Sequence, residues 1–494
     1  MHLLIMAMVI GVFLHDNPPW DGDDAAPAVL QTVADAPHIW VPIMLGTKIL
    51  LIVMYGLLCQ SVRKRMDMSA MHSDATAAGL RWIDRGSIVY RILVLALYVQ
   101  DLALGGLVWL RELLPANLVL IDELLFMAPT LATIIAGWWL YYPIDRRMRE
   151  SLLIRQLDAG QPVHEVWTRG QYVVSQLRHQ VALVFLPLIL IMGWNEFVRR
   201  ILIEHLPEGF YLVDALTIGG ALFVFIIAPA VIRCVWDTVP LPDGELRDRL
   251  TSLCHQYRVG VRELLLWKTF GGMINAAVLG IIAPLRYILL TDALLETMPN
   301  ASVEAVMAHE VAHVKKHHMF WLAITAISLL GALEIICMLM LTTIATIVAP
   351  VLLDDVQLAA VIPLTSFVCT LTFWAMLFGW VSRRFERQAD TFAVQHFHHK
   401  FASQNDEVTD PRLVNESSAR VMTDSLQRVA DLNHIATNRR SWRHGSIAWR
   451  QDYLMDLVGK PVDELPIDRQ VIWIKLGGAM TLAFTVAAIF LMEI

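Results

Sequence analysis

The sequence predicts a mainly α-helical, multi-pass membrane protein with a small α+β domain on the cytoplasmic side. Hydrophobic residues make up 56% of its 494 residues and charged residues only 17%, with a mean hydropathy of +0.53. A soluble chain of this size is less apolar and more charged. Apolar stretches of about 20 residues, the length that a helix needs to cross a bilayer, recur along the chain. Lys and Arg are concentrated in alternate segments between them, as in membrane proteins with a fixed orientation.

The predicted spans are eight apolar stretches, near residues 40–60, 88–110, 119–142, 180–197, 212–235, 319–347, 358–381 and 471–492. Residues 1–15 are also apolar but short. We interpret them as a first short span, because a signal peptide would have a basic start and a clear small-residue cleavage site. The chain is therefore expected to have about eight or nine spans.

The charges between the spans predict the orientation of the chain. The segments rich in Lys and Arg are 61–65, 145–155, 236–318 and 382–470, whereas the loops 15–27 and 350–357 are acidic and contain neither. Counting the spans in order places nearly all basic segments on one side, which the positive-inside rule makes the cytoplasm. The loop 198–210, with Arg199 and Arg200, is the exception. The expected location is the plasma membrane of a bacterium, with the two long basic segments in the cytoplasm.

The spans and loops divide the chain into five parts. Residues 1–235 form an N-terminal multi-span region, and residues 319–382 form a transmembrane hairpin. The segments on either side of the hairpin, 236–318 and 383–456, are two halves of one cytoplasmic domain, and residues 457–494 are a C-terminal linker and span. A hairpin of two spans starts and ends on the same side of the membrane, so the chain returns to the cytoplasmic face.

The first cytoplasmic half is predicted to contain both helices and strands. Residues 241–259 have apolar side chains at helical spacing. Short apolar runs at 261–268, 274–281 and 286–292, separated by Gly and Pro, predict strands. Asn300 can cap the helix that follows. The net charge of −7 does not indicate nucleic-acid binding, and the five cysteines have neither metal-ligand nor disulfide spacing.

The helix before the hairpin carries the sequence HEVAH at residues 309–313. His309 and His313 lie one helical turn apart on one face, so both imidazoles can point at one metal ion. Glu310, beside them, can reach a water molecule bound to that ion. This arrangement is typical of zinc hydrolases, in which the carboxylate takes a proton from the water and passes it on. The alternative is that these residues form a solvated helix face near a membrane. The next two histidines, His317 and His318, are interpreted as side chains at the membrane interface.

A catalytic zinc site needs a third protein ligand and an open fourth position. Lys316 and Met319 stand where a metzincin has Gly and His, which excludes that class. Glu386, in the stretch RRFERQADTFA directly after the returning span, is the expected third ligand. Asp390, one turn later, can accept a hydrogen bond from a ligand histidine and fix its tautomer.

Taken together, these motifs resemble the integral-membrane zinc endopeptidases that include the type I CAAX prenyl protease and the bacterial protease HtpX. HEVAH and the later ERQAD match the HExxH and ExxxD motifs of this gluzincin family. NAAVLG (275–280), followed by RYILLTDALL (286–295), resembles a family strand and the strand that leads to the zinc helix. RHGSIAWRQDYL (443–454) resembles its C-terminal His-x5-Arg-x3-Leu element, with Gly445 in place of the usual Pro. The likeness covers residues 240 to about 456.

The resemblance implies a gluzincin-type zinc peptidase domain with one zinc ion per chain, whose partners are a polypeptide or membrane-protein substrate and the lipid bilayer. The implied site residues are His309, His313 and Glu386 as zinc ligands, Glu310 as general base and acid, Asp390 as the residue that orients a ligand, His444 as a donor to the oxyanion, Arg450 as a charge that holds this region or the substrate, and Asn275 on a strand whose edge accepts the substrate backbone. Neither a physiological substrate nor an oligomeric state is implied.

Three other functions fit parts of the sequence less well. An intramembrane protease of the site-2 type has HExxH inside a span and a later Asp-Gly motif, whereas LPDG (241–244) precedes HEVAH here and lies in a soluble stretch. A catalytically silent scaffold or transporter would carry the motif without zinc. A sensor protease that transmits a signal would need a large external domain, and the external loops are short.

Overall fold

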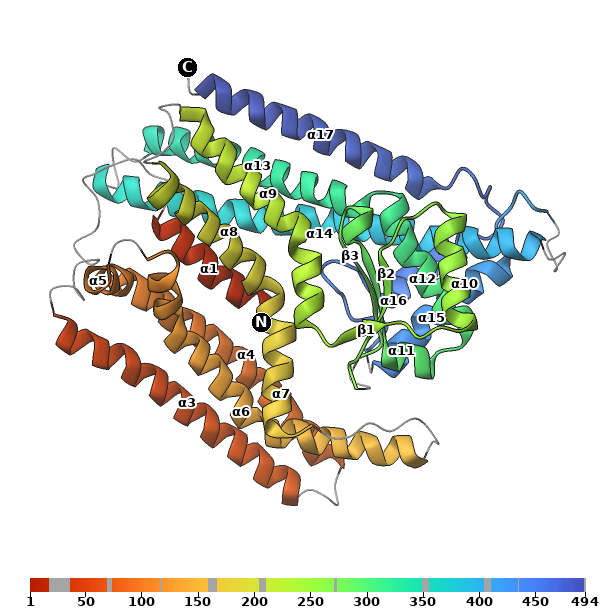
Figure 1. Cartoon of the computed structure of the whole chain (residues 1–494), viewed down its shortest axis with the longest axis horizontal. Helices are drawn as coiled ribbons and strands as arrows, with labels where there is room; N and C mark the ends of the chain where they lie inside the picture. The colour runs from red at the N-terminus through yellow and green to blue at the C-terminus, as the bar shows by residue number, and fades with distance from the viewer. Residues whose placement is uncertain are drawn as a thin grey trace. The chain divides into compact units, whose positions relative to one another are not determined.

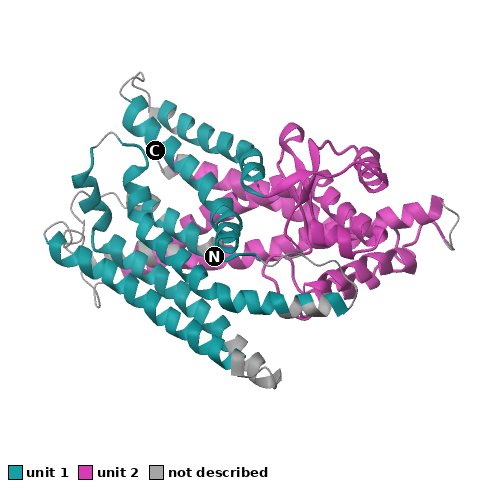
Figure 2. Cartoon of the chain, turned by 60° about the horizontal axis from the view of Figure 1, so that its bottom comes forward, with its two compact units in different colours: residues 1–236 teal, residues 237–494 magenta. Residues whose placement is uncertain are grey.

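A computed structural model of the chain describes residues 1–16, 36–68, 73–115, 118–158, 167–203, 210–270, 273–348, 355–403, 410–433 and 435–492. The described residues are mainly helical, with one small sheet (Figure 1), which confirms the predicted fold class. The chain forms two compact units, residues 1–236 and residues 237–494 (Figure 2).

Unit 1 is helical throughout its described residues. Its helices pack through apolar and aromatic side chains: Tyr55 of α3 stacks on Tyr90 of α4 with ring centroids 4.2 Å apart. Lys48 of α3 and Asp101 of α4 form a buried ion pair, which offsets the cost of placing either charge within a span. The elements are α1 (His2–Asp16), α3 (Pro37–Met68), α4 (Ser73–Ala103), α5 (Gly106–Leu113), α6 (Ile121–Asp158), α7 (Arg169–Gln176), a π-helical turn (Leu177–Ala182), α8 (Leu183–Phe197), a second π-helical turn (Val198–Leu202) and α9 (Phe210–Val235).

Seven helical runs among the described residues are long and apolar enough to cross a membrane, as a multi-pass membrane protein requires. Residues 1–15 fall almost entirely in α1, whose 15 residues are fewer than the ~20 that a span needs. Residues 358–381 lie in helix α14 (Asp355–Ser403), and a span there stays a prediction because part of that stretch is outside the residues with described side chains. The seven runs are Pro37–Met66, Trp82–Ala103, Ile121–Glu150, Arg169–Leu202, Ala215–Val235, His318–Ile347 and Pro466–Ala488.

Unit 2 contains a four-stranded sheet with the strand order β1-β2-β4-β3. Strands β2 and β4 are parallel, and the other two pairs are antiparallel. Strand β4 is buried along its whole length, as its run of Tyr, Ile and Leu predicts for a central strand. Strand β3 is an edge strand of this sheet. The strands are β1 (Thr238–Pro240), β2 (Glu263–Trp267), β3 (Ala276–Leu279) and β4 (Tyr287–Thr291).

Helix α12 (Asn300–Lys315) packs against β3, α14 and α15. Small residues on its inner side, such as Ala305 and Ala308, are completely buried and allow its neighbours to approach closely. The prediction that Asn300 caps this helix is wrong: Pro299 holds the cap position in an extended conformation, and Asn300 is the first helical residue. The other helices are α10 (Glu245–Gln256), α11 (Asp292–Thr297), α13 (His318–Val348), α14 (Asp355–Ser403), α15 (Glu416–Leu432), α16 (Ile447–Met455) and α17 (Pro466–Met492).

Helices α13 and α14 pack against each other (Figure 1), and the transmembrane hairpin that they would form stays a prediction. Helix α14 is one uninterrupted helix of 49 residues, which at a rise of 1.5 Å per residue makes it about 74 Å long. Its C-terminal part, beyond the expected span, packs against α12. The predicted span and the residues of α14 that contact α12 therefore belong to one continuous helix.

Asn433, which follows α15, ties this helix to the segment before β3. Its side-chain oxygen accepts a hydrogen bond from the Ile274 amide (3.0 Å), and its Nδ2 donates to the Ile274 carbonyl (2.9 Å). The side chain thus pairs with the backbone as a neighbouring strand would. Because Ile274 is buried, both of its backbone groups depend on this partner.

We expect Asn433→Ala to lower the Tm of the detergent-solubilised protein, since it leaves two buried backbone groups unpaired at a cost of about 1–3 kcal/mol each. Ser417→Ala, at an exposed position of α15, is the matched control and should leave the Tm unchanged. If Asn433→Ala melts at the wild-type temperature, this side chain does not hold β3 in place.

Candidate metal centre

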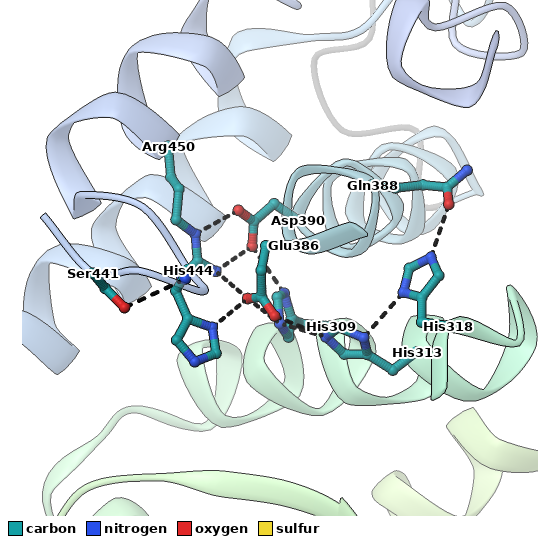
Figure 3. Close-up of polar contacts among 9 residues, drawn as sticks. All are labelled: His309, His313, His318, Glu386, Gln388, Asp390, Ser441, His444 and Arg450. Atoms are coloured by element: carbon teal, nitrogen blue, oxygen red, sulfur yellow. Dashed lines mark hydrogen bonds and ion pairs between the residues drawn. The ribbon is translucent and has the colours of Figure 1, made fainter. Parts of the chain in front are cut away.

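Two histidines of α12 point in the same direction and lie next to each other (Figure 3). His309 and His313 are one turn apart, and their Nε2 atoms are separated by 3.2 Å. His309 is buried and His313 is half-buried. Since α12 is packed against β3, α14 and α15, both imidazoles are held in this arrangement.

Glu386 of α14 completes a group of three donors. Its Oε2 lies 3.6 Å from His309 Nε2, and its Oε1 lies 3.7 Å from His313 Nε2. Ligand atoms held at about 2.0–2.2 Å around a tetrahedral zinc ion are about 3.3–3.6 Å apart. The two imidazole nitrogens and the Glu386 carboxylate, which presents one oxygen to each histidine, lie close enough together to hold a zinc ion that keeps its fourth position open.

Among the described residues, unit 1 contains a second group of side chains that could offer metal ligands, and this group consists of carboxylates alone. Asp122, Glu123 and Glu196 offer carboxylate oxygens within 4.8 Å of one another. Arg111 forms ion pairs with Asp122 and Glu123, and Arg200 forms one with Glu196. Because guanidinium groups already neutralise these carboxylates, we interpret the group as an ion-pair network and not as a metal centre.

Asp390, one turn beyond Glu386, joins three segments of unit 2. Its Oδ1 accepts a hydrogen bond from His309 Nδ1 (2.8 Å), so that the other ring nitrogen faces the donor group. Arg450 of α16 donates from Nε to Oδ2 (2.7 Å) and from Nη2 to Oδ1 (2.6 Å). Asp390 is completely buried, and a buried carboxylate is stable only when partners of this kind surround it. The guanidinium of Arg450 is thus engaged by a carboxylate of the protein.

The carboxylates around the two histidines favour a positive charge at this place, either a proton on an imidazole or a metal ion. Burial lowers the pKa of His309, but its contacts with Asp390 and Glu386 outweigh burial and raise the pKa to about 10. Burial lowers the pKa of His313 to about 4. In the absence of metal, one imidazole therefore holds a proton that a divalent ion can replace, as metal binding to histidine requires.

Glu310 is half-buried on α12, near the edge strand β3. Burial is the largest influence on this carboxyl and raises its pKa, and Glu386 acts in the same direction. The positive charge of His309 and the backbone amide of Val278 favour the charged form. A carboxylate with a raised pKa is suited to accept a proton near neutral pH.

His444 reaches the donor group from an exposed turn before α16. Its Nδ1 lies 2.9 Å from Glu386 Oε2, and its side chain is 50% exposed. Ser441 and Gly445 close the turn, since each donates its amide to the carbonyl of the other (3.2 and 3.0 Å). Gly445 has a φ of +79°, which the ring of the Pro expected from the resemblance cannot adopt. The turn of this chain is therefore built differently from one with Pro at that position.

Asn275 lies directly before β3. Its amide donates to Thr291 Oγ1 (3.0 Å), and its carbonyl accepts from the Thr291 amide (3.1 Å). The residue is exposed. Within the described sheet, β3 pairs with β4 alone, so its other edge can pair with an extended peptide.

The interpretation of His318 as an interfacial side chain is wrong. It is completely buried at the start of α13, where its ring stacks on Phe385 with centroids 4.7 Å apart. Its Nδ1 lies 3.0 Å from His313 Nδ1, and its Nε2 lies 2.8 Å from Gln388 Oε1 (Figure 3). His318 therefore supports the second histidine of the motif, as a carboxylate supports the first. The sequence offers one signal for this burial: His318 is a polar residue at the very start of an apolar span.

Comparison with known proteins connects this region to a family of peptidases. Residues 265–409 match the model of peptidase family M48, and this segment contains both HEVAH and ERQAD. No curated protein sequence matches the chain. Among solved structures, the crystal structure of S. mikatae Ste24p is similar over 84% of this chain and 99% of that chain, with 15% sequence identity and a TM-score of 0.43.

We expect Arg450→Ala to lower the free energy of unfolding by about 3–5 kcal/mol, because it leaves the Asp390 carboxylate buried without its cation. Adding Asp390→Asn should recover part of that loss. Melting in detergent with a chelator present measures both variants without a contribution from metal. Arg428→Ala, at an exposed position of α15, is the control. A wild-type Tm for Arg450→Ala would show that this ion pair does not stabilise unit 2.

Proposed function

We propose that this chain is a zinc-dependent endopeptidase of membranes with its active site at the cytoplasmic face, and the match of residues 265–409 to the model of peptidase family M48 supports a metallopeptidase. The observation that carries the proposal is the convergence of His309, His313 and Glu386, whose donor atoms are 3.2–3.7 Å apart. We propose polypeptides, including membrane proteins of the same bilayer, as its substrates.

One zinc ion held by these three residues would polarise the scissile carbonyl and lower the pKa of a bound water to about 7. Glu310 takes the proton of the attacking water and delivers it to the leaving amine. Its partial burial and raised pKa support this role, because a base that also returns the proton works best with a pKa near the working pH.

Three residues hold the ligands in place without touching the substrate. Asp390 fixes the orientation of His309, and Arg450 in turn neutralises Asp390. On the other side, His318 contacts the ring of His313. Supporting contacts of this kind typically change metal affinity or activity by about 10–100-fold. The resemblance implied that Arg450 holds either this region or the substrate. We propose the first of these roles, in which Arg450 is a positioning residue.

His444 and the edge of β3 are proposed to act on the substrate. His444 is half exposed beside Glu386, where its imidazole can donate to the carbonyl oxygen as negative charge develops. A preorganised donor of this kind typically contributes roughly 3 kcal/mol to lowering the barrier. The substrate would lie as an extended strand along β3, next to Asn275, and pair with its free backbone groups.

The proposed sidedness rests on the basic segments 236–318 and 382–470 and on the acidic loops 15–27 and 350–357. Anionic lipids and the machinery of insertion retain Lys and Arg on the cytoplasmic side. We place the protein in the plasma membrane of a bacterium, with the metal centre facing the cytoplasm.

The purified protein should contain about one zinc ion per chain, by the rule of three protein ligands for catalytic sites. Glu386→Ala removes the carboxylate ligand and should weaken zinc binding by more than the ~10–100-fold typical of supporting residues. Metal analysis after gel filtration measures both proteins, with Glu416→Ala at an exposed position as the control. Full zinc retention by Glu386→Ala would remove Glu386 from the ligand set.

Glu310→Gln should keep the zinc and the fold but cleave a model polypeptide at least ~100-fold more slowly, since an amide cannot take the proton of the water. The same substitution at exposed Glu416 should cleave at the wild-type rate. Near-normal cleavage by Glu310→Gln would reject Glu310 as the general base.

Both halves of the peptidase domain should face the cytoplasm. In a background without the native cysteines, Ser403→Cys should react with a membrane-impermeant thiol reagent only after cell lysis, because it lies within the basic segment 382–470. Asp355→Cys, at the start of α14, should react in intact cells. The reverse labelling pattern would place the metal centre outside.

A further inference from the structure

The turn that carries His444 contacts α14, the helix that contains the predicted returning span. The two hydrogen bonds between Ser441 and Gly445 leave Trp442, Arg443 and His444 as its tip. Figure 3 shows Ser441 and His444 on this turn, with the imidazole of His444 directed toward the donor group. Whatever fixes the tip therefore also fixes His444.

Trp442 fits closely on α14. Its indole Nε1 donates to the carbonyl of Ala375 (2.7 Å), and its ring lies beside Phe378 with centroids 5.8 Å apart. Arg383 of α14 donates to the Trp442 carbonyl (2.8 Å). Gly379 provides the space, because a Cβ at that position would lie 2.4 Å from the indole nitrogen. The turn is thus held on this helix through both its side chain and its backbone.

These contacts place the tip where the bilayer interface is expected. Exposed apolar side chains of α14 continue up to Trp380, and Arg383 and Arg384 follow. Ala375 lies eight residues before Arg383, which is about 12 Å along the helix. Trp side chains are enriched where the apolar core of a membrane meets the headgroups. Trp442, which is 44% exposed on this part of α14, has the position of such an interfacial residue.

The same segment is strongly basic. Arg439, Arg440 and Arg443 are exposed, and in the part of the chain that the structure describes none of them has an acidic partner. Other surface arginines of unit 2, such as Arg412 and Arg420, do pair with carboxylates. Guanidinium groups without counterions, beside an interfacial Trp, are suited to the phosphates of anionic lipids.

We propose that residues 437–446 dock on the anionic headgroups of the cytoplasmic leaflet and thereby hold His444 at the metal centre. The inference rests on the proposed function and adds lipid charge as a determinant of its rate. The bilayer is the occupant that fits, because Trp442 already lies on the helix that carries the predicted returning span. Arg443 directly precedes His444, so a headgroup bound to Arg443 restricts the motion of the catalytic tip.

The test uses the full-length, zinc-loaded protein in nanodiscs of neutral phosphatidylcholine, alone or mixed with anionic phosphatidylglycerol. The wild type should cleave a model polypeptide at least about fivefold faster in the anionic discs, the factor that one basic side chain contributes at an anionic surface. A variant with Gln in place of the three unpaired arginines should lose this gain and keep the wild-type rate in neutral discs. A control with the same charge change at other exposed positions should keep the gain: Arg258→Gln, Arg420→Gln and Arg428→Gln.

Hydrogen exchange of residues 437–446 provides a readout that does not depend on catalysis. The wild-type amides should exchange more slowly in anionic than in neutral discs, and the variant without the three arginines should show no difference. If the protein holds no zinc and cleaves nothing, the proposed function fails, while slower exchange still supports docking.

Equal exchange in both kinds of disc would overturn docking even in an active enzyme. A gain in rate that survives the loss of the three arginines would overturn it as well. Inorganic phosphate added to neutral discs should have no effect. If it slows exchange as the anionic lipid does, the segment is a site for a soluble anion and the proposal is wrong.

Discussion

The proposed metal centre depends on one buried carboxylate, that of Asp390. From its place on α14 it contacts His309 of α12 and Arg450 of α16, and it is completely buried. A carboxylate in such a place is strongly destabilising without its partners. The three helices must therefore come together as a unit, and their assembly fixes which nitrogen of His309 faces the donor group. The contacts that hold these three helices together therefore also orient the candidate ligand His309.

Local spacing was enough to predict which side chains face each other, because the four-residue interval of HEVAH places two imidazoles on one helix face. The two spans predicted between HEVAH and Glu386 cross the membrane an even number of times. They return the chain to the same face, so Glu386 was expected beside the two histidines. The burial of His318 was beyond such reasoning, since it follows from the turn between α12 and α13 and from contact with Gln388, 70 residues away. The contact of Trp442 with Ala375 spans 67 residues and likewise depends on tertiary packing.

The hairpin connects the membrane to the chemistry through rigid elements. His313 is supported by His318, the first residue of one arm, and His309 is supported by Asp390 on the other arm. The turn with His444 lies on that same second arm through Trp442. A displacement of either arm would therefore move a proposed ligand or the proposed oxyanion donor, which gives a physical reason for placing the proposed site beside this hairpin.

The most direct test of the central claim is the X-ray absorption spectrum of the zinc-loaded protein at the zinc edge, which reports the atoms bound to the ion. We predict only nitrogen and oxygen neighbours at about 2.0–2.2 Å, with the scattering of two imidazole rings and one carboxylate. A sulfur neighbour near about 2.3 Å would contradict the assignment, because it would require a cysteine ligand. A spectrum with three imidazole rings would contradict it too, and would make His444 or His318 a ligand in place of Glu386.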